Sequence, residues 1–159
     1  MGTVLIAEAG VNHNASLDRA FEMIVMTSTA GKAAYQESDG DRGESQLAMA
    51  ERIHLPVTAF SELARHCERR GIGFLSTPFD LTSLAVLTEL RMDYLKIPSG
   101  EITNIPLLRA AAEAELPVIM STGMATLDEV DLALETLVNY GTDRQKITLM
   151  HCTSAYPTP

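Results

Sequence analysis

The sequence contains no tryptophan, only two cysteines and no apolar run near the ~20 residues that a membrane-spanning helix needs. Cys67 and Cys152 form no CxxC or other ligand spacing, so neither a cysteine-based metal site nor a disulfide framework is indicated. The first residues lack the basic region and the apolar stretch of a signal peptide. We therefore expect a soluble, cytoplasmic protein with reduced thiols.

Positive charge is also scarce. Twelve Lys and Arg stand against 21 Asp and Glu, which gives a net charge of −9 over 159 residues. A surface of this sign repels phosphate backbones and anionic lipids, and the densest basic stretch, 65–70, is interrupted by Glu68. We expect neither nucleic acid nor a membrane as a partner. The length and the 46% hydrophobic content fit one globular domain.

Short apolar runs alternate with longer stretches of helical period. The five runs, read as strands, are 3–7, 72–76, 94–98, 117–121 and 146–151. The helical stretches begin near Ser16 and then cover about 58–71, 83–90, 104–115 and 126–141. This alternation predicts an α/β fold with a parallel sheet, because strands buried on both faces are short and almost wholly apolar. An open doubly wound sheet and part of a (β/α)8 barrel both fit it.

Several predicted helix ends carry specific signals. Thr126 followed by Glu129 forms a capping box, and Asn104 precedes a helix with Pro106 in its first turn. Gly71 suits the left-handed conformation just beyond a helix end.

Polar residues follow each apolar run, where ligands meet parallel β/α folds. Lys96 lies within an apolar run, so its ammonium should meet either a carboxylate or a bound anion. Ser99-Gly100 and Ser121-Thr122-Gly123 combine hydroxyl donors with glycines that let a backbone approach phosphate oxygens. Glu8 and Glu101 could transfer protons or bind hydroxyls. The set suits an anionic, phosphorylated small molecule.

Each feature also has a structural interpretation. Lys96 could form an ion pair with Glu8 or Glu101. Ser-Thr-Gly after a strand is common turn chemistry. His13 and His151 fit hydrogen-bonded structural groups better than ligands, because no HExxH or HxH spacing accompanies them.

Five segments together resemble the successive strand-end motifs of the sialic acid synthase (N-acetylneuraminate synthase) family. They are IAEAGVNHN (6–14), FLSTPFD (74–80), LKIPSGEI (95–102), PVIMSTGMATLDEV (117–130) and LMHCTSAYPTP (149–159). The resemblance implies a carbohydrate-biosynthetic transferase that condenses phosphoenolpyruvate with N-acetylmannosamine or a related N-acetylated sugar. The products would be a nonulosonic acid and phosphate.

The resemblance also implies roles for residues at matching motif positions. Glu8 and Glu101 would be catalytic, with Glu101 on the sugar side; Thr77, Lys96, Ser99 and Ser121 would bind phosphoenolpyruvate; and Ser154 and Tyr156 would bind the sugar.

The implied fold is a TIM (β/α)8 barrel, here partial, with about five of eight strands. The family's second strand is missing after Gly31, so 1–159 would be a partial N-terminal barrel domain without the C-terminal antifreeze-like domain. The family's two metal-binding histidines, which hold Mn or Mg, come after the last motif, so this chain would supply no metal ligand. A homodimer is implied for the full-length enzyme.

Two other functions remain open. The chain could be a catalytically inactive fragment or a binding module, because the second strand and the metal histidines are missing. It could also be another phosphate-binding β/α-barrel enzyme of aldolase type. The motifs do not specify the sugar or the metal.

Overall fold

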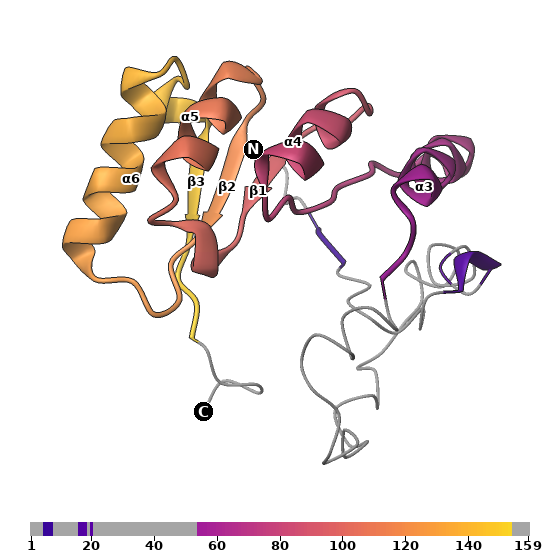
Figure 1. Cartoon of the computed structure of the whole chain (residues 1–159), viewed down its shortest axis with the longest axis horizontal. Coiled ribbons are helices and arrows are strands. Elements are labelled where there is room, and N and C mark those ends of the chain that lie inside the picture. Colours follow the sequence, from indigo (N-terminus) through magenta and orange to yellow (C-terminus); the bar gives the residue numbers. More distant parts are fainter. Residues whose placement is uncertain (1–4, 8–15, 19, 21–53, 154–159) are drawn as a thin grey trace, which may run out of the picture. The chain divides into compact units, whose positions relative to one another are not determined.

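The computed structural model of the chain describes residues 5–7, 16–18, 20 and 54–153 (Figure 1). The chain divides into two compact units, 1–72 and 73–159. In the first unit, residues 17, 18 and 20 are helical, which agrees with the helix predicted near Ser16.

Helix α3, Val57–Arg70, is the longest described element of the first unit. Its buried residues, Ala59, Leu63 and Cys67, recur every four positions and so form one stripe of the helix. Gly71 ends the helix at φ 70°, and its N–H donates to the carbonyl of Glu68. The predicted helix and its glycine cap are confirmed.

The second unit contains a parallel sheet of three strands, β1 (Leu95–Ile97), β2 (Val118–Ser121) and β3 (Ile147–Met150), in that order. Leu95 pairs with Val118, and Val118 in turn pairs with Ile147. Three of the predicted strands are therefore confirmed, each a residue or two shorter than the apolar run that predicts it. The α/β class with a parallel sheet is confirmed for this unit.

The strand predicted at 72–76 is wrong. This run forms only an isolated parallel bridge, between Phe74 and Met92. Ile72 is 42% exposed. Glycine at position 73 weakens a strand, because it loses more backbone entropy on folding and has no side chain to pack. Of the first predicted strand, 3–7, residues 5–7 have no strand structure and the remainder lies outside the described residues.

Three α-helices accompany the sheet: α4 (Leu81–Thr88), α5 (Ile105–Glu113) and α6 (Leu127–Asn139). Helix α5 connects β1 to β2 and α6 connects β2 to β3, and α5 contacts both α4 and α6 (Figure 1). When parallel strands follow one another across a sheet in chain order, right-handed crossovers place the successive connecting helices on the same face of that sheet. Two 3-10 turns, η2 (Ser99–Glu101) and η3 (Arg144–Lys146), complete the unit.

The helix starts follow the sequence signals. The Thr126 hydroxyl accepts from the Glu129 N–H at 3.3 Å, and the Glu129 carboxylate accepts from the Thr126 N–H at 2.7 Å, which is the predicted capping box. Asn104 caps α5 as predicted. Helix α4 begins two residues before its predicted start, because the Asp80 carboxylate accepts from the Ser83 N–H at 2.8 Å. These Ser83 hydrogen bonds lower the pKa of Asp80.

The two faces of the sheet differ in chemistry. Side chains at alternate positions of a strand share one face, so Leu95, Ile97, Val118 and Met120 lie together, and all four are fully buried. Lys96 points to the opposite face, and its registered neighbours are Ile119 and then Thr148. Ser121 shares that face with Ile119 because the two are separated by two positions. The sheet therefore has one wholly apolar face and one that carries Lys96 and Ser121.

Candidate functional site

The ends of β1 and β2 are joined by a hydrogen bond between a side chain and the backbone. The Oγ of Ser99, in η2 after β1, accepts from the backbone N–H of Gly123, after β2, at 2.9 Å. A Cβ on Gly123 would lie 3.0 Å from this Oγ and 3.6 Å from the Cβ of Cys152. Glycine at 123 thus makes room for the Ser99 side chain. From the sequence we instead expected this glycine to let the backbone approach a ligand.

The ends of β2 and β3 are joined next to this contact. Thr122 donates to the carbonyl of Met150 twice, from its backbone N at 3.1 Å and from its Oγ1 at 3.0 Å. The carboxyl ends of all three strands are therefore linked through residues 99, 122–123 and 150. Thr122 and Gly123 thus make turn contacts, as one of the two interpretations of the Ser-Thr-Gly segment predicts.

Two predicted anion-binding residues share the polar face of the sheet. Lys96 is half-buried in β1, and its Nζ donates to the carbonyl of Ile97 at 3.2 Å. Ser121, the last residue of β2, is 6% exposed. Because β1 and β2 are hydrogen-bonded neighbours, an ammonium and a hydroxyl lie on adjacent strands of one face. A positive charge beside hydroxyl donors is suited to a phosphorylated or carboxylated ligand.

Glu101 ends the 3-10 turn that Ser99 begins. Its Oε2 accepts from the Nδ2 of Asn104 at 2.7 Å, and its backbone carbonyl accepts from the Asn104 N–H at 3.0 Å. The Oδ1 of the same asparagine accepts from the Leu107 N–H at 3.2 Å and so caps α5. The carboxylate is therefore held by the N-cap residue of α5.

The other predicted site residues have different outcomes. Thr77 is half-buried in the segment between the bridge residue Phe74 and α4. His151 is exposed just after β3. The remaining predicted positions, Glu8, His13, Ser154 and Tyr156, lie outside the described residues.

Sequence reasoning identified Asn104 as a helix cap and missed its contact with Glu101. The signal was present, because residues three apart across a turn can meet, and an amide has both a donor and an acceptor to offer. The partner of Gly123 could not be found in this way, because Ser99 is 24 positions away.

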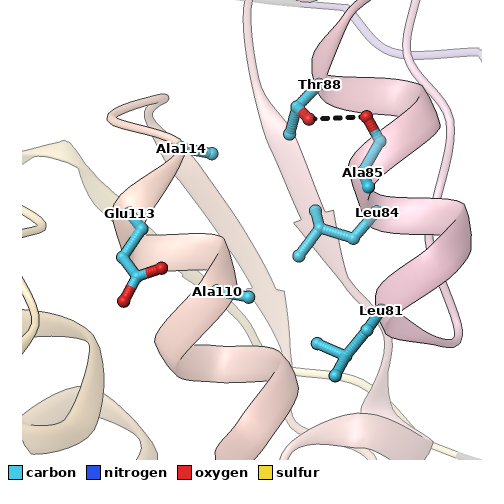
Figure 2. A pocket seen from close by; sticks show the side chains of 7 residues that line it. All are labelled: Leu81, Leu84, Ala85, Thr88, Ala110, Glu113 and Ala114. Atoms are coloured by element: carbon cyan, nitrogen blue, oxygen red, sulfur yellow. Dashed lines mark hydrogen bonds between the residues drawn. The ribbon is translucent and has the colours of Figure 1, made fainter.

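A hollow of about 280 Å³ lies between α4 and α5, away from the linked strand ends. Figure 2 shows Leu81 and Leu84 of α4 facing Ala110 of α5, while the carboxylate of Glu113 points away from α4. None of its lining residues is a predicted site residue. The hollow is a gap between packed helices and lacks the convergent polar groups of a substrate site.

In the described part of the chain, no three side chains of His, Cys, Asp or Glu gather closely enough to hold a metal ion. The residues described do not form a metal centre. None of the described helices is long and apolar enough to span a bilayer.

Comparison with known proteins gives a consistent result. The NeuB family matches residues 7–159. The N,N'-diacetyllegionaminic acid synthase of Campylobacter jejuni is 43% identical over 99% of this chain and 53% of its own length. The N-acetylneuraminate-9-phosphate synthase of Drosophila melanogaster is 31% identical over 97% of this chain and 46% of its own. The chain thus spans about half the length of these curated relatives.

Solved structures show the same likeness. The N-acetylneuraminic acid (sialic acid) synthetase of Leptospira borgpetersenii, in complex with citrate, superposes on this chain with a TM-score of 0.78 at 31% sequence identity. The match covers 96% of this chain and 55% of the synthetase chain. The spore coat polysaccharide biosynthesis protein SpsE of Bacillus subtilis gives 0.75 at 32% identity, over 96% and 44%. The family match covers nearly the whole chain, and several of the similar proteins are named as synthases of legionaminic acid or of N-acetylneuraminate 9-phosphate. The chain belongs to the NeuB family.

Proposed function

We propose that the chain supplies the phosphoenolpyruvate-binding part of a synthase that condenses phosphoenolpyruvate with an N-acetylated sugar to form a nonulosonic acid and phosphate. The observation that carries the proposal is the placement of Lys96 and Ser121 on the same sheet face, on adjacent strands, next to the linked ends of β1 and β2. The names of the relatives support the class of product. N-acetylmannosamine and a diacetamido sugar are the candidate acceptors.

The proposed fold of the complete enzyme is a (β/α)8 barrel, of which this chain contributes part. The sequential order of β1, β2 and β3, with helical crossovers between neighbours, supports a barrel over a doubly wound sheet, in which the strand order reverses. Lys96 and Ser121 would then face the barrel interior at its carboxyl end.

The chemistry is assigned to residues as follows. Lys96 pairs with the anionic groups of phosphoenolpyruvate, and the hydroxyls of Ser99, Ser121 and Thr77 donate to its oxygens. Gly123 occupies one acceptor position of the Ser99 Oγ and leaves the hydroxyl proton available to donate. Held in this way, the substrate presents its methylene carbon to the sugar aldehyde.

The reaction then balances without an added oxidant or reductant. A C–C bond forms between the methylene carbon and the aldehyde carbon, and the aldehyde oxygen takes a proton through Glu8 or Glu101. Water adds to the cationic carbon that results, and the C–O bond to phosphate breaks. Ser154 and Tyr156 are proposed to contact the sugar. The described residues contain no group of three His, Cys, Asp or Glu side chains that could hold the divalent metal implied by the resemblance, and none of these steps is routed through it.

The test is phosphate release by the complete gene product, with mass spectrometry of the product. Release should require both phosphoenolpyruvate and the sugar, and the product mass should equal phosphoenolpyruvate plus sugar plus water minus phosphoric acid. No product from either candidate sugar would contradict the proposal. Phosphoenolpyruvate binding without turnover would favour the second candidate, a binding module. A Lys96 adduct trapped by borohydride would favour an aldolase instead.

A further inference from the structure

The segment after β1 contains an asparagine whose two side-chain ends make different hydrogen bonds. Asn104 donates from Nδ2 to the Oε2 of Glu101 at 2.7 Å and accepts on Oδ1 from the Leu107 N–H at 3.2 Å. A cap needs only the acceptor, and serine or aspartate would provide one equally well. The amide donor is the part of Asn104 that helix capping does not explain.

Two hydrogen bonds from Asn104 restrain Glu101, one to its side chain and one to its backbone. The backbone carbonyl of Glu101 accepts from the Asn104 N–H at 3.0 Å, so the two residues are joined through backbone and side chain together. Ile102, between them, is 3% exposed and anchors the turn in the core. The carboxylate therefore has little freedom to rotate away from the end of β1.

We propose that Asn104 is a positioning residue, which fixes the orientation of the Glu101 carboxylate toward the sugar while it caps α5. The inference rests on the proposed function, because Glu101 matters to catalysis only if the chain is part of such a synthase. A carboxylate hydrogen-bonded through one oxygen presents its other oxygen in a fixed direction. Misplacing a reacting group by about 1 Å can slow a reaction on the order of 100-fold, so a residue that orients a catalytic carboxylate contributes to activity.

The test separates the two hydrogen bonds of Asn104. Asn104→Ser retains a capping oxygen but is too short to cap the helix and also reach Glu101, and Asn104→Asp retains the cap but places a second carboxylate beside the first. Both variants of the complete gene product should unfold near the wild-type denaturant midpoint. Both should lower kcat/KM for the sugar by about tenfold or more, while KM for phosphoenolpyruvate stays unchanged.

Thr126→Ala is the matched control, because it removes the N-cap of α6 and leaves Glu101 untouched. It should lower stability while kcat/KM for the sugar stays near the wild-type value. Asn104→Ser with wild-type kcat/KM, or with a loss no larger than that of Thr126→Ala, would overturn the positioning role and leave the proposed function standing. A wild-type protein that forms no product would overturn both.

A second measurement is independent of turnover. In the NMR spectrum of the wild-type protein, the side-chain amide of Asn104 should exchange slowly and should shift on Glu101→Gln, whereas the Asn139 amide should not change. An Asn104 amide that is insensitive to Glu101→Gln would show that the contact is not maintained in solution, and it would overturn the inference even if the Asn104 variants fail to fold.

Discussion

The Oγ of Ser99 and the backbone N of Gly123 lie 2.9 Å apart, in segments that follow two different strands. This hydrogen bond fixes the Ser99 side chain against the end of β2, and the missing Cβ of glycine permits it. Glu101 lies two positions after Ser99 in the same turn. The contact therefore helps to position both the proposed phosphoenolpyruvate-binding hydroxyl of Ser99 and the proposed catalytic carboxylate of Glu101.

Gly123→Ala should destabilise the second unit by about 1–3 kcal/mol, the usual range for overpacking. The new Cβ would lie 3.0 Å from the Ser99 Oγ and 3.4 Å from the Ser99 Cβ, so the side chain or the turn must shift. Urea denaturation followed by circular dichroism measures the change. In a Ser99→Ala background the cost should be smaller, because the nearest atom is gone.

Gly100→Ala serves as the stability control for this pair. Nothing lies within 4 Å of a Cβ at position 100, so this substitution should change the unfolding free energy by less than about 1 kcal/mol. Equal losses for the two alanine variants would contradict the steric role assigned to Gly123.

Lys96→Met should raise the dissociation constant for phosphoenolpyruvate at least tenfold. The substitution retains the aliphatic volume in β1 and removes the charge proposed to meet the anion. Lys146→Met is the matched control, since it removes the same charge just before β3, at the opposite end of the strands. Calorimetric titration of both variants checks the prediction, and equal losses of affinity would indicate only a general effect of net charge.

Thr126→Ala should lower the unfolding free energy by about 1 kcal/mol. It leaves the Glu129 N–H without its capping acceptor and breaks the reciprocal capping box. Thr103→Ala offers a comparison, because Thr103 is exposed and the substitution also removes one hydroxyl. The difference between their urea midpoints measures the cap, and a difference near zero would argue against it.

Asp80 should make stability depend on pH in the acid range. Hydrogen bonds from Ser83 lower the pKa of Asp80 in the folded protein below the ordinary aspartate value of about 3.9. The unfolded chain therefore binds the proton more readily, and this stabilisation is present above about pH 4 and lost as pH falls through the folded pKa. Asp80→Asn keeps a capping oxygen and removes the titration, so the two urea midpoints should converge on acidification. A constant separation would contradict this linkage.

The two thiols should differ in reactivity. Cys67 is 4% exposed in α3, and burial raises its pKa, so little thiolate forms near neutral pH. Cys152 is half-buried after β3. Iodoacetamide should label Cys152 before Cys67 in the native protein, as peptide mass spectrometry would show, and both should react equally in urea. Faster native labelling of Cys67 would mean that α3 opens readily.

Local signals predicted the helices well because capping depends on residues three positions apart. The Thr126–Glu129 box and the Gly71 cap involve only near neighbours, so the sequence contains all the information needed to place them. The run at 72–76 failed because strand formation also requires a partner strand along its whole length, and only Phe74 found one.

The sequence by itself determined the α/β class, the strand ends at which polar residues gather, and the family resemblance that the comparisons confirmed. Tertiary structure alone decided that Ser99 meets Gly123 and that Lys96 and Ser121 share a face. The physical reason is distance along the chain. Register between strands and contacts between the ends of different strands depend on how separate segments pack, and no local pattern encodes the position of a partner that folding alone brings near.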